Sequence, residues 1–330
     1  MTMVDIDIHD CIQGVLKHDR RMIAKTITLI ESSLPAHQKL AQEVINQLLP
    51  YTGKATRLGI TGAPGTGKST FIESLGTILV EKGHKVAVLT VDPSSVRSGG
   101  SILADRTRME KLSAEERVYI RPSPSGGLLS GVARKTRETM LVCEAAGFDV
   151  VIVETVGVGQ SEVAVASMVD FFLVLMIPGG GDELQGIKRG IMELADAVVI
   201  NKADGDNINK AKMAKRQYEM AMRLLNPVSP NWTPPVLTCS ALEMTGIEEV
   251  WETVLDYIGK LTATGELKLK REKQNIDWMH FLVTERIKEW FYEKLYDQQL
   301  IPQVEKEVRE GKITPVAAAN KLWSIAHLCG

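Results

Sequence analysis

Seven short apolar runs, separated by longer segments with helical periodicity, constrain the fold of this 330-residue chain more than any other feature. Runs of five to eight residues bounded by turns are typical of strands that are buried on both faces. Helices between such strands produce parallel crossover connections. We therefore predict an α/β fold with a doubly wound, mostly parallel sheet of the P-loop NTPase type, and its strands at RLGIT (57–61), KVAVLTVD (85–92), VYIRP (118–122), DVVIVE (149–154), FFLVLMI (171–177), DAVVIN (196–201) and PVLTCS (235–240).

Apolar residues at helical spacing flank this region on both sides and divide the chain into three predicted parts. Residues 1–54 are an N-terminal helical extension, residues 55–262 carry the sheet, and residues 263–330 form a C-terminal helical arm. The arm holds three of the five tryptophans, Trp278, Trp290 and Trp323. So short a segment does not readily form a core of its own. We expect it to pack on the main domain or on a second copy of the chain, because aromatic stripes commonly mark interfaces.

Charge and composition limit the partners. The net charge of −2 argues against a general binder of nucleic acid or of acidic membranes, so we expect neither as a partner. The longest apolar run, 171–177, is too short to span a bilayer. The first residues lack a basic-then-apolar signal, and the four dispersed cysteines resemble neither a metal site nor a disulfide framework. A cytoplasmic protein is the expectation.

The stretch GITGAPGTGKST contains the pattern G-x-x-x-x-G-K-S between a predicted strand and a predicted helix. Glycines allow main-chain N–H groups to surround an anion, and the helix N-terminus adds partial positive charge. We expect Lys68 to reach the β- and γ-phosphates of a nucleotide and the Ser69 hydroxyl to ligate Mg²⁺. The predicted phosphate-binding residues are Gly62, Ala63, Pro64, Gly65, Thr66, Gly67, Lys68, Ser69 and Thr70.

A second motif, VVINKAD, indicates which base is bound. It supplies Asn201, Lys202 and Asp204 after a predicted strand. The Asp204 carboxylate can accept from both N1–H and the exocyclic amine of guanine, which adenine does not offer. After the last predicted strand, main-chain N–H groups of the turn at Ser240, Ala241 and Leu242 are expected to meet the guanine O6. GTP and GDP are therefore the predicted ligands, together with Mg²⁺.

Carboxylates at other strand ends complete the predicted metal site. Glu154 ends the strand that should lie beside the phosphate-loop strand, so it can hold Mg²⁺ directly or through water. Asp92 ends another strand and is expected to assist the metal or position the attacking water. Asp105 is a further candidate at the metal, and the Gly157 N–H is placed to sense the γ-phosphate.

Four residues are the predicted catalytic set: Lys68, Asp92, Glu154 and Lys188. Lys188 lies in a glycine-rich segment, where a basic group can neutralise charge on the phosphoryl group. Whether Lys188 or Arg189 takes that role, or whether both belong to a surface loop, stays open. Gln160 is equally open, as a catalytic residue or a polar loop residue, because it follows Gly157 later than a water-orienting glutamine usually does.

Taken together, six motifs resemble the MeaB/ArgK GTPases, which are also described as LAO/AO transport system kinases. They are GAPGTGKST (62–70), VLTVDPSS (88–95), SGGSILADRTRM (98–109), VIVETVGVGQSE (151–162), PGGGDELQGIK (178–188) and NKAD (201–204). The resemblance implies a P-loop GTPase of the metallochaperone class, with HypB and UreG, that forms a homodimer through its C-terminal arm. It also implies switch loops at 94–109, 155–166 and 178–188, and a partner: adenosylcobalamin-dependent methylmalonyl-CoA mutase, whose cofactor loading and protection such proteins serve.

Three functions remain as alternatives. The first is a GTP-hydrolysing chaperone of the mutase. The second is a kinase that phosphorylates periplasmic lysine/arginine/ornithine-binding transport proteins, which the cysteine usage and the missing signal disfavour. The third is a nucleotide-dependent scaffold.

Overall fold

The computed structural model describes residues 7–91, 109–123, 129–155, 161–179, 189–225, 229–296 and 300–328. Within the chain, contacts separate two compact units whose boundary lies between Arg271 and Glu272. The compact division therefore falls further along the chain than the predicted boundary at residue 262. The three-part division itself stays a prediction, and the two units are described separately.

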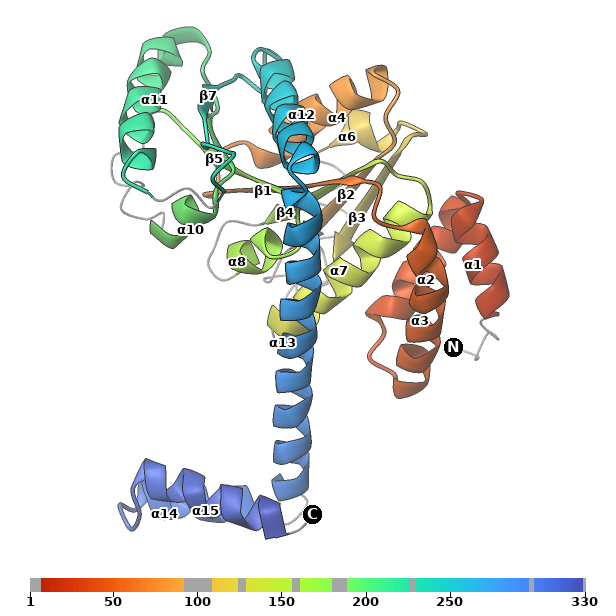
Figure 1. Ribbon diagram of the computed structural model, residues 1–330, viewed down its shortest axis with the longest axis vertical. Coiled ribbons are helices and arrows are strands. Elements are labelled where there is room, and N and C mark those ends of the chain that lie inside the picture. The colour runs from red at the N-terminus through yellow and green to blue at the C-terminus, as the bar shows by residue number, and fades with distance from the viewer. Residues whose placement is uncertain are drawn as a thin grey trace. The chain divides into compact units, whose positions relative to one another are not determined.

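A sheet of seven parallel strands forms the centre of the first unit, in the order β3-β2-β4-β1-β5-β6-β7 (Figure 1). Each predicted apolar run forms one strand, so the predicted doubly wound sheet is confirmed, and every pair in it is parallel. The strands are β1 (Thr56–Gly62), β2 (Val86–Val91), β3 (Val118–Ser123), β4 (Val150–Thr155), β5 (Phe171–Met176), β6 (Ala197–Ile200) and β7 (Val236–Thr238).

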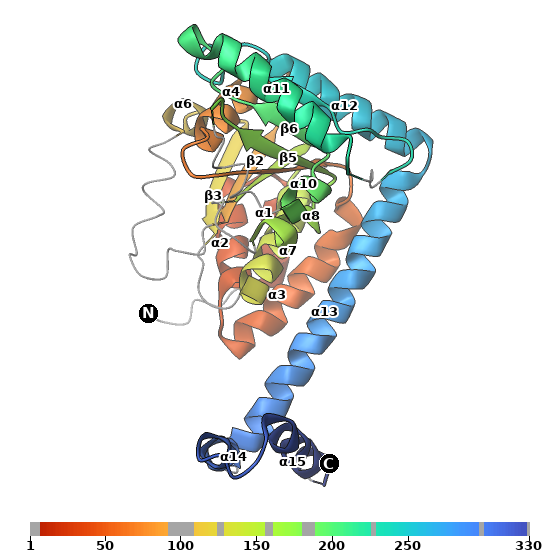
Figure 2. The ribbon, with the colours of Figure 1, turned by 90° about the vertical axis from the view of Figure 1, so that its left-hand side faces the viewer.

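Helices cover both faces of this sheet. Helices α4 and α12 pack together on one face, and α8 packs with α7 and α10 on the other (Figures 1 and 2). Because the strands are parallel, the carboxyl ends of β1 and its neighbours lie at one edge of the sheet, where ligands bind in such folds. The helices of this region are α4 (Lys68–Glu81), α6 (Glu110–Ser113), α7 (Leu129–Ala145), α8 (Ser161–Ala166), α10 (Arg189–Leu194), α11 (Ile208–Met222) and α12 (Ile247–Ala263), with 3-10 turns η1 (Leu49–Tyr51) and η3 (Gly205–Asn207).

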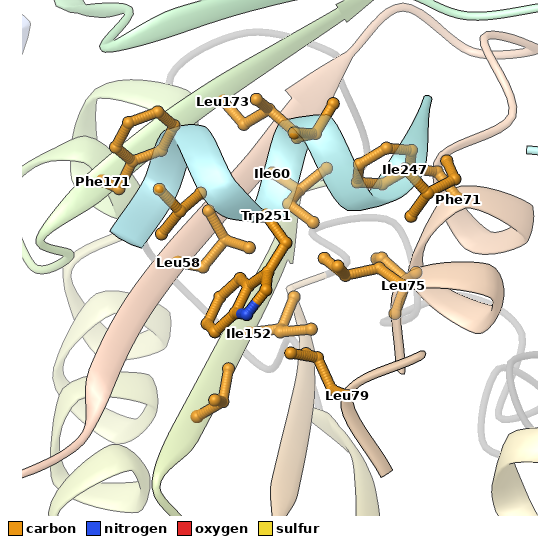
Figure 3. Packing of buried hydrophobic residues seen from close by; sticks show 14 of the residues in the cluster. Leu58, Ile60, Phe71, Leu75, Leu79, Ile152, Phe171, Leu173, Ile247 and Trp251 are labelled. Atoms are coloured by element: carbon orange, nitrogen blue, oxygen red, sulfur yellow. The ribbon is translucent and has the colours of Figure 1, made fainter. Parts of the chain in front are cut away.

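The main core lies between α12, α4 and the sheet. Trp251 of α12 is almost fully buried and points toward Leu58 of β1 and Ile152 of β4 (Figure 3). Leu75 and Leu79 of α4 close the same cluster. A buried tryptophan at this position joins helix and sheet, because its large ring contacts several elements at once.

Three helices precede the sheet, as the apolar spacing predicted: α1 (Ile8–Leu16), α2 (Arg20–Glu31) and α3 (Pro35–Leu48). Two of them begin at aspartates that cap free main-chain N–H groups: Asp7 accepts from His9 and Asp10, and Asp19 accepts from Arg21 and Met22. Helices α2 and α3 both pack on α7. The extension is therefore part of the first compact unit.

Charged side chains close the amino edge of the sheet, the edge at which its strands begin. Arg57 of β1 pairs with Glu144 of α7, with Nε 2.6 Å from Oε1. Asp170, which precedes β5, accepts from the Arg57 main-chain N–H at 2.8 Å and from the Arg271 Nη2 at 2.6 Å. Arg271 also donates to the carbonyls of Gly53 and Ala55. Burial of these ions is tolerated because each carboxylate has several donors.

Helix α13 (Glu266–Tyr296) begins in the first unit and continues into the second, which starts at Glu272. The second unit also contains α14 (Leu300–Arg309) and α15 (Pro315–Leu328). Leu295 and Ile301 are buried together, and Phe291, Leu322 and Ile325 pack against them. The segment therefore buries a small apolar cluster of its own. The expectation that it also packs on the main domain or on a second copy of the chain stays a prediction. None of the helices in the described ranges has the length and apolar character needed to cross a membrane.

Candidate nucleotide-binding site

The glycine-rich loop joins the end of β1 to the start of α4, as predicted. Gly67 precedes the helix with φ +87°, and a Cβ there would lie 2.7 Å from Nδ2 of Asn201. At Gly62 a Cβ would lie 2.5 Å from the Leu175 carbonyl oxygen. The loop passes so close to its neighbours that a side chain would clash at either position, which is why both residues are glycine. The loop amides lie at the start of the helix, where they can bind an anion.

Lys68 lies across this loop. Its side chain is buried, and Nζ donates to the Gly62 carbonyl at 2.8 Å and to the Ala63 carbonyl at 3.2 Å. The Thr66 hydroxyl also donates to Ala63, at 2.9 Å. A fixed ammonium beside the positive end of a helix makes this loop suited to a polyanion.

Ser69 and Glu154, two of the predicted magnesium ligands, lie next to each other. Glu154 is the next-to-last residue of β4 and pairs with Ile60 of β1. The Ser69 hydroxyl donates to its Oε1 at 3.3 Å. A hydroxyl and a carboxylate are the hard oxygen ligands that Mg²⁺ takes when nucleotide phosphates and water supply the rest, so these residues fit the ion. Within the described ranges, no group of three or more His, Cys, Asp or Glu side chains forms a metal-binding cluster.

Asn201 joins the phosphate loop to the predicted base-binding turn. It is buried just after β6, and its Nδ2 donates to the Thr66 carbonyl at 2.8 Å. Its Oδ1 accepts from the Ala241 N–H at 3.0 Å and from the Cys239 thiol at 3.5 Å. One side chain therefore holds together loops that lie 135 and 40 residues apart from it in sequence.

Asp204 lies at the same edge, beside the turn that follows β7. Its Oδ2 accepts from the Ser240 hydroxyl at 2.5 Å, and that hydroxyl accepts from the Glu243 N–H at 3.1 Å. A carboxylate has about four lone-pair sites, so this contact orients Asp204 without exhausting its capacity to accept. Lys202, two residues earlier, is exposed and has φ +58°.

The expected contacts of main-chain N–H groups with guanine O6 need a correction at two residues. The Ser240 N–H donates to the Thr245 carbonyl at 2.9 Å, and the Ala241 N–H donates to Asn201. Both amides are thus used inside the protein, which sequence reasoning missed because neither partner can be read from spacing. The Leu242 N–H is the one of the three without an acceptor among the described residues.

Two further residues of the site escaped the sequence analysis. Ser74 of α4 is buried, and its hydroxyl donates to the Ala241 carbonyl at 2.6 Å. Its position on a helix face shared with Phe71 and Leu75 was the available signal, because a buried hydroxyl needs a partner. Cys239 is the second: burial, and then the negative charge of Asp204, raises the pKa of its thiol to about 12, so it stays a neutral donor.

Several predicted residues lie outside the described residues: Asp92, Asp105, Gly157, Gln160 and Lys188. Arg189 begins α10, but its side chain is not described either. The catalytic, metal and sensing roles assigned to these residues stay predictions.

Comparisons with known proteins agree on one family. A sequence model described as Methylmalonyl Co-A mutase-associated GTPase MeaB matches residues 23–295. GTPase ArgK of Escherichia coli is 50% identical over 278 residues, 84% of each chain. The mitochondrial Methylmalonic aciduria type A homolog of Mus musculus is 46% identical over 319 residues, 94% of this chain and 77% of that protein. A solved structure named LAO/AO transport system kinase aligns with TM-score 0.80 and 39% identity, over 99% of this chain and 100% of the other.

Proposed function

Because the chain belongs to the MeaB family of methylmalonyl-CoA mutase-associated GTPases, we propose that it is a Mg²⁺-dependent GTPase that serves as a chaperone for adenosylcobalamin-dependent methylmalonyl-CoA mutase. The reaction converts GTP and water to GDP and inorganic phosphate. The proposed service is the loading and protection of the mutase cofactor in the cytoplasm. Binding of guanine nucleotides follows from the family alone.

One observation carries the proposal. Asn201 donates to the Thr66 carbonyl and accepts from the Ala241 N–H, so one buried side chain joins the loop proposed to bind phosphate to the turn proposed to select the base. Asp204 lies beside that turn, held by Ser240. A carboxylate placed to accept two donors from guanine disfavours a base that offers neither, because its acceptor sites are then left unpaired.

In the proposed reaction the protein mostly positions and neutralises charge. Lys68 and the amides of its loop hold the β- and γ-phosphates, and Ser69 with Glu154 would hold Mg²⁺, which neutralises charge on the phosphates. We assign the water-positioning role to Asp92 and the neutralising role at the transferred phosphoryl group to Lys188.

Hydrolysis tests the enzymatic part of the proposal. We expect the purified chain to release phosphate from GTP and not from ATP, only with Mg²⁺ present. Lys68→Ala should lower the rate by about 100-fold or more, since it removes a charge-stabilising donor. Equal rates with GTP and ATP, or an unchanged rate in Lys68→Ala, would contradict it.

The partner is a separate proposal, supported by the family description and by the relatives. We expect saturating methylmalonyl-CoA mutase to accelerate GTP hydrolysis and to co-elute with the chain. If the chain hydrolyses GTP at a rate that the mutase does not change, the chaperone role is contradicted while the GTPase activity is not.

We also propose a homodimer formed through the arm. Trp290 is 52% exposed and Trp323 is 61% exposed in the second unit, and such aromatic side chains favour an interface. Sedimentation velocity of the full chain, compared with Trp290→Ser, tests it: the dimer should weaken in the variant, and a wild-type chain that is monomeric at all concentrations argues against it.

A kinase is the second candidate, because one similar solved structure is named as one. GTP labelled at the γ-phosphate distinguishes the two reactions. Label released as free phosphate supports the GTPase, and label transferred to a transport-binding protein supports the kinase.

A further inference from the structure

Ser74 touches neither phosphate nor base in the proposed site, yet it holds the base-binding turn to the phosphate-binding helix. We propose that Ser74 is a positioning residue for guanine recognition. The inference rests on the proposed nucleotide-binding function and adds a residue that neither the sequence motifs nor the family description contains.

The first step is the contact itself. Ser74 lies on α4, six residues after Lys68, and its Oγ donates to the Ala241 carbonyl at 2.6 Å. Both residues are buried, with exposed fractions of 7% for Ser74 and 3% for Ala241. A buried carbonyl that loses its donor costs more free energy than an average hydrogen bond contributes, because no water replaces the donor.

The second step is that Ala241 is held from two sides. Its carbonyl accepts from Ser74, and its N–H donates to Asn201. The two side chains come from different elements, α4 and the loop after β6. Both main-chain polar groups of Ala241 are therefore bonded to side chains, so its position depends on Ser74 and on Asn201.

The third step closes a ring. Asn201 also donates to Thr66 of the phosphate loop, and that loop continues directly into α4, which carries Ser74. Three hydrogen bonds, Asn201 to Thr66, Ala241 to Asn201 and Ser74 to Ala241, thus form a closed circuit with the stretch of chain that runs from Thr66 to Ser74. Such buried circuits rigidify what they connect. Ser74 is the member of the circuit that sequence motifs do not mark.

The consequence concerns the base and not the phosphates. Ala241 lies between Ser240, which orients Asp204, and Leu242, whose N–H is the remaining candidate for O6. Loss of the Ser74 hydroxyl frees this turn while Lys68 keeps its own carbonyl partners. If Ser74 positions the turn, removing its hydroxyl lowers the contribution of the base to nucleotide affinity and leaves the contribution of the phosphates unchanged.

A matched control lies on the same helix. The Thr77 hydroxyl donates to the Glu73 carbonyl at 2.9 Å, a bond that stays within α4. Thr77→Ala removes a hydroxyl from this helix without touching the turn. Ser74→Cys provides a second test variant, since it keeps a weak donor and similar volume if Ser74→Ala proves poorly folded.

The experiment measures the affinities of wild type and variants for GDP, and for pyrophosphate as a probe without a base, by competition with a fluorescent GDP. We expect Ser74→Ala to lower the affinity for GDP by about tenfold and the affinity for pyrophosphate by less than about twofold. Ser74→Cys should lower the affinity for GDP by less than Ser74→Ala does. Thr77→Ala should match wild type with both probes.

The outcomes separate two failures. GDP affinity in Ser74→Ala equal to that of Thr77→Ala overturns the inference, and so does an equal loss for GDP and pyrophosphate, which would indicate a merely structural residue. A wild-type chain that binds pyrophosphate but prefers no base would instead overturn the proposed function, and the inference with it.

Discussion

At the amino edge of the sheet, charged side chains pair directly with one another, whereas at the carboxyl edge side chains bond mainly to main-chain groups. Arg57 and Glu144 represent the first kind of contact, and Asn201 with Thr66 and Ala241 the second. Ion pairs close the amino edge and bury it. Side-chain bonds to loops shape the carboxyl edge, where the nucleotide is proposed to bind. On this account, stability and binding are concentrated at opposite ends of the same strands.

The largest expected effect comes from breaking the amino edge. Glu144→Ala leaves Arg57 with an uncompensated buried charge and removes the acceptor of the Gly53 N–H. We expect a loss of about 3–5 kcal/mol in the free energy of unfolding, measured by urea denaturation. GDP affinity of the folded protein should stay close to wild type.

Asp256→Ala is the control for that prediction. Asp256 pairs with Lys260 on the surface of α12, with both side chains about half exposed. Its loss should cost less than about 0.5 kcal/mol. A Glu144→Ala protein as stable as Asp256→Ala would show that the buried pair contributes no more than a surface pair.

The next effect lies at the carboxyl edge. Asp204→Ala removes the carboxylate that is expected to bind guanine, and we predict a loss of GDP affinity of about 1.5–3 kcal/mol, by calorimetry. Unfolding without nucleotide should change little, because Asp204 is partly exposed. Asp206→Ala, an exposed neighbour in η3, should bind GDP as wild type does. Equal affinities of the two variants would remove Asp204 from base recognition.

The smallest effect concerns Cys239, behind the base site. Its pKa is raised to about 12 by burial, so above pH 9 the unfolded chain releases a proton that the folded chain retains, and the contribution of the thiol to stability falls with rising pH. Cys239→Ala should cost about 1 kcal/mol at pH 8. We expect the difference from wild type to shrink toward pH 11 in thermal unfolding. A constant or growing difference would contradict this sign.

The sequence predicted the elements better than the contacts between them. All seven strands follow from apolar runs, because strands buried on both faces need continuous apolar residues. The positions of Lys68, Ser69 and Glu154 at the strand and helix ends were predictable from the motifs, because phosphate and magnesium chemistry requires those residue types there; their roles stay predictions.

Tertiary pairing explains what the sequence did not reveal. Arg57 and Glu144 are 87 residues apart, and Ser74 and Ala241 are 167 apart, so no local pattern joins them. The Ala241 N–H was predicted to bind guanine because its actual acceptor, the Asn201 side chain, was itself predicted to bind the nucleotide. The small core of the C-terminal arm was missed because it depends on helices that fold back on each other.

The most direct test of the central claim, that one pocket unites phosphate binding with guanine selection, is calorimetric titration of the purified chain with GDP and with ADP in the presence of Mg²⁺. The account predicts that GDP binds at least about 100-fold more tightly than ADP, since a site that hydrogen-bonds one base rejects an analogue without the donors. Equal affinities for the two nucleotides would contradict it.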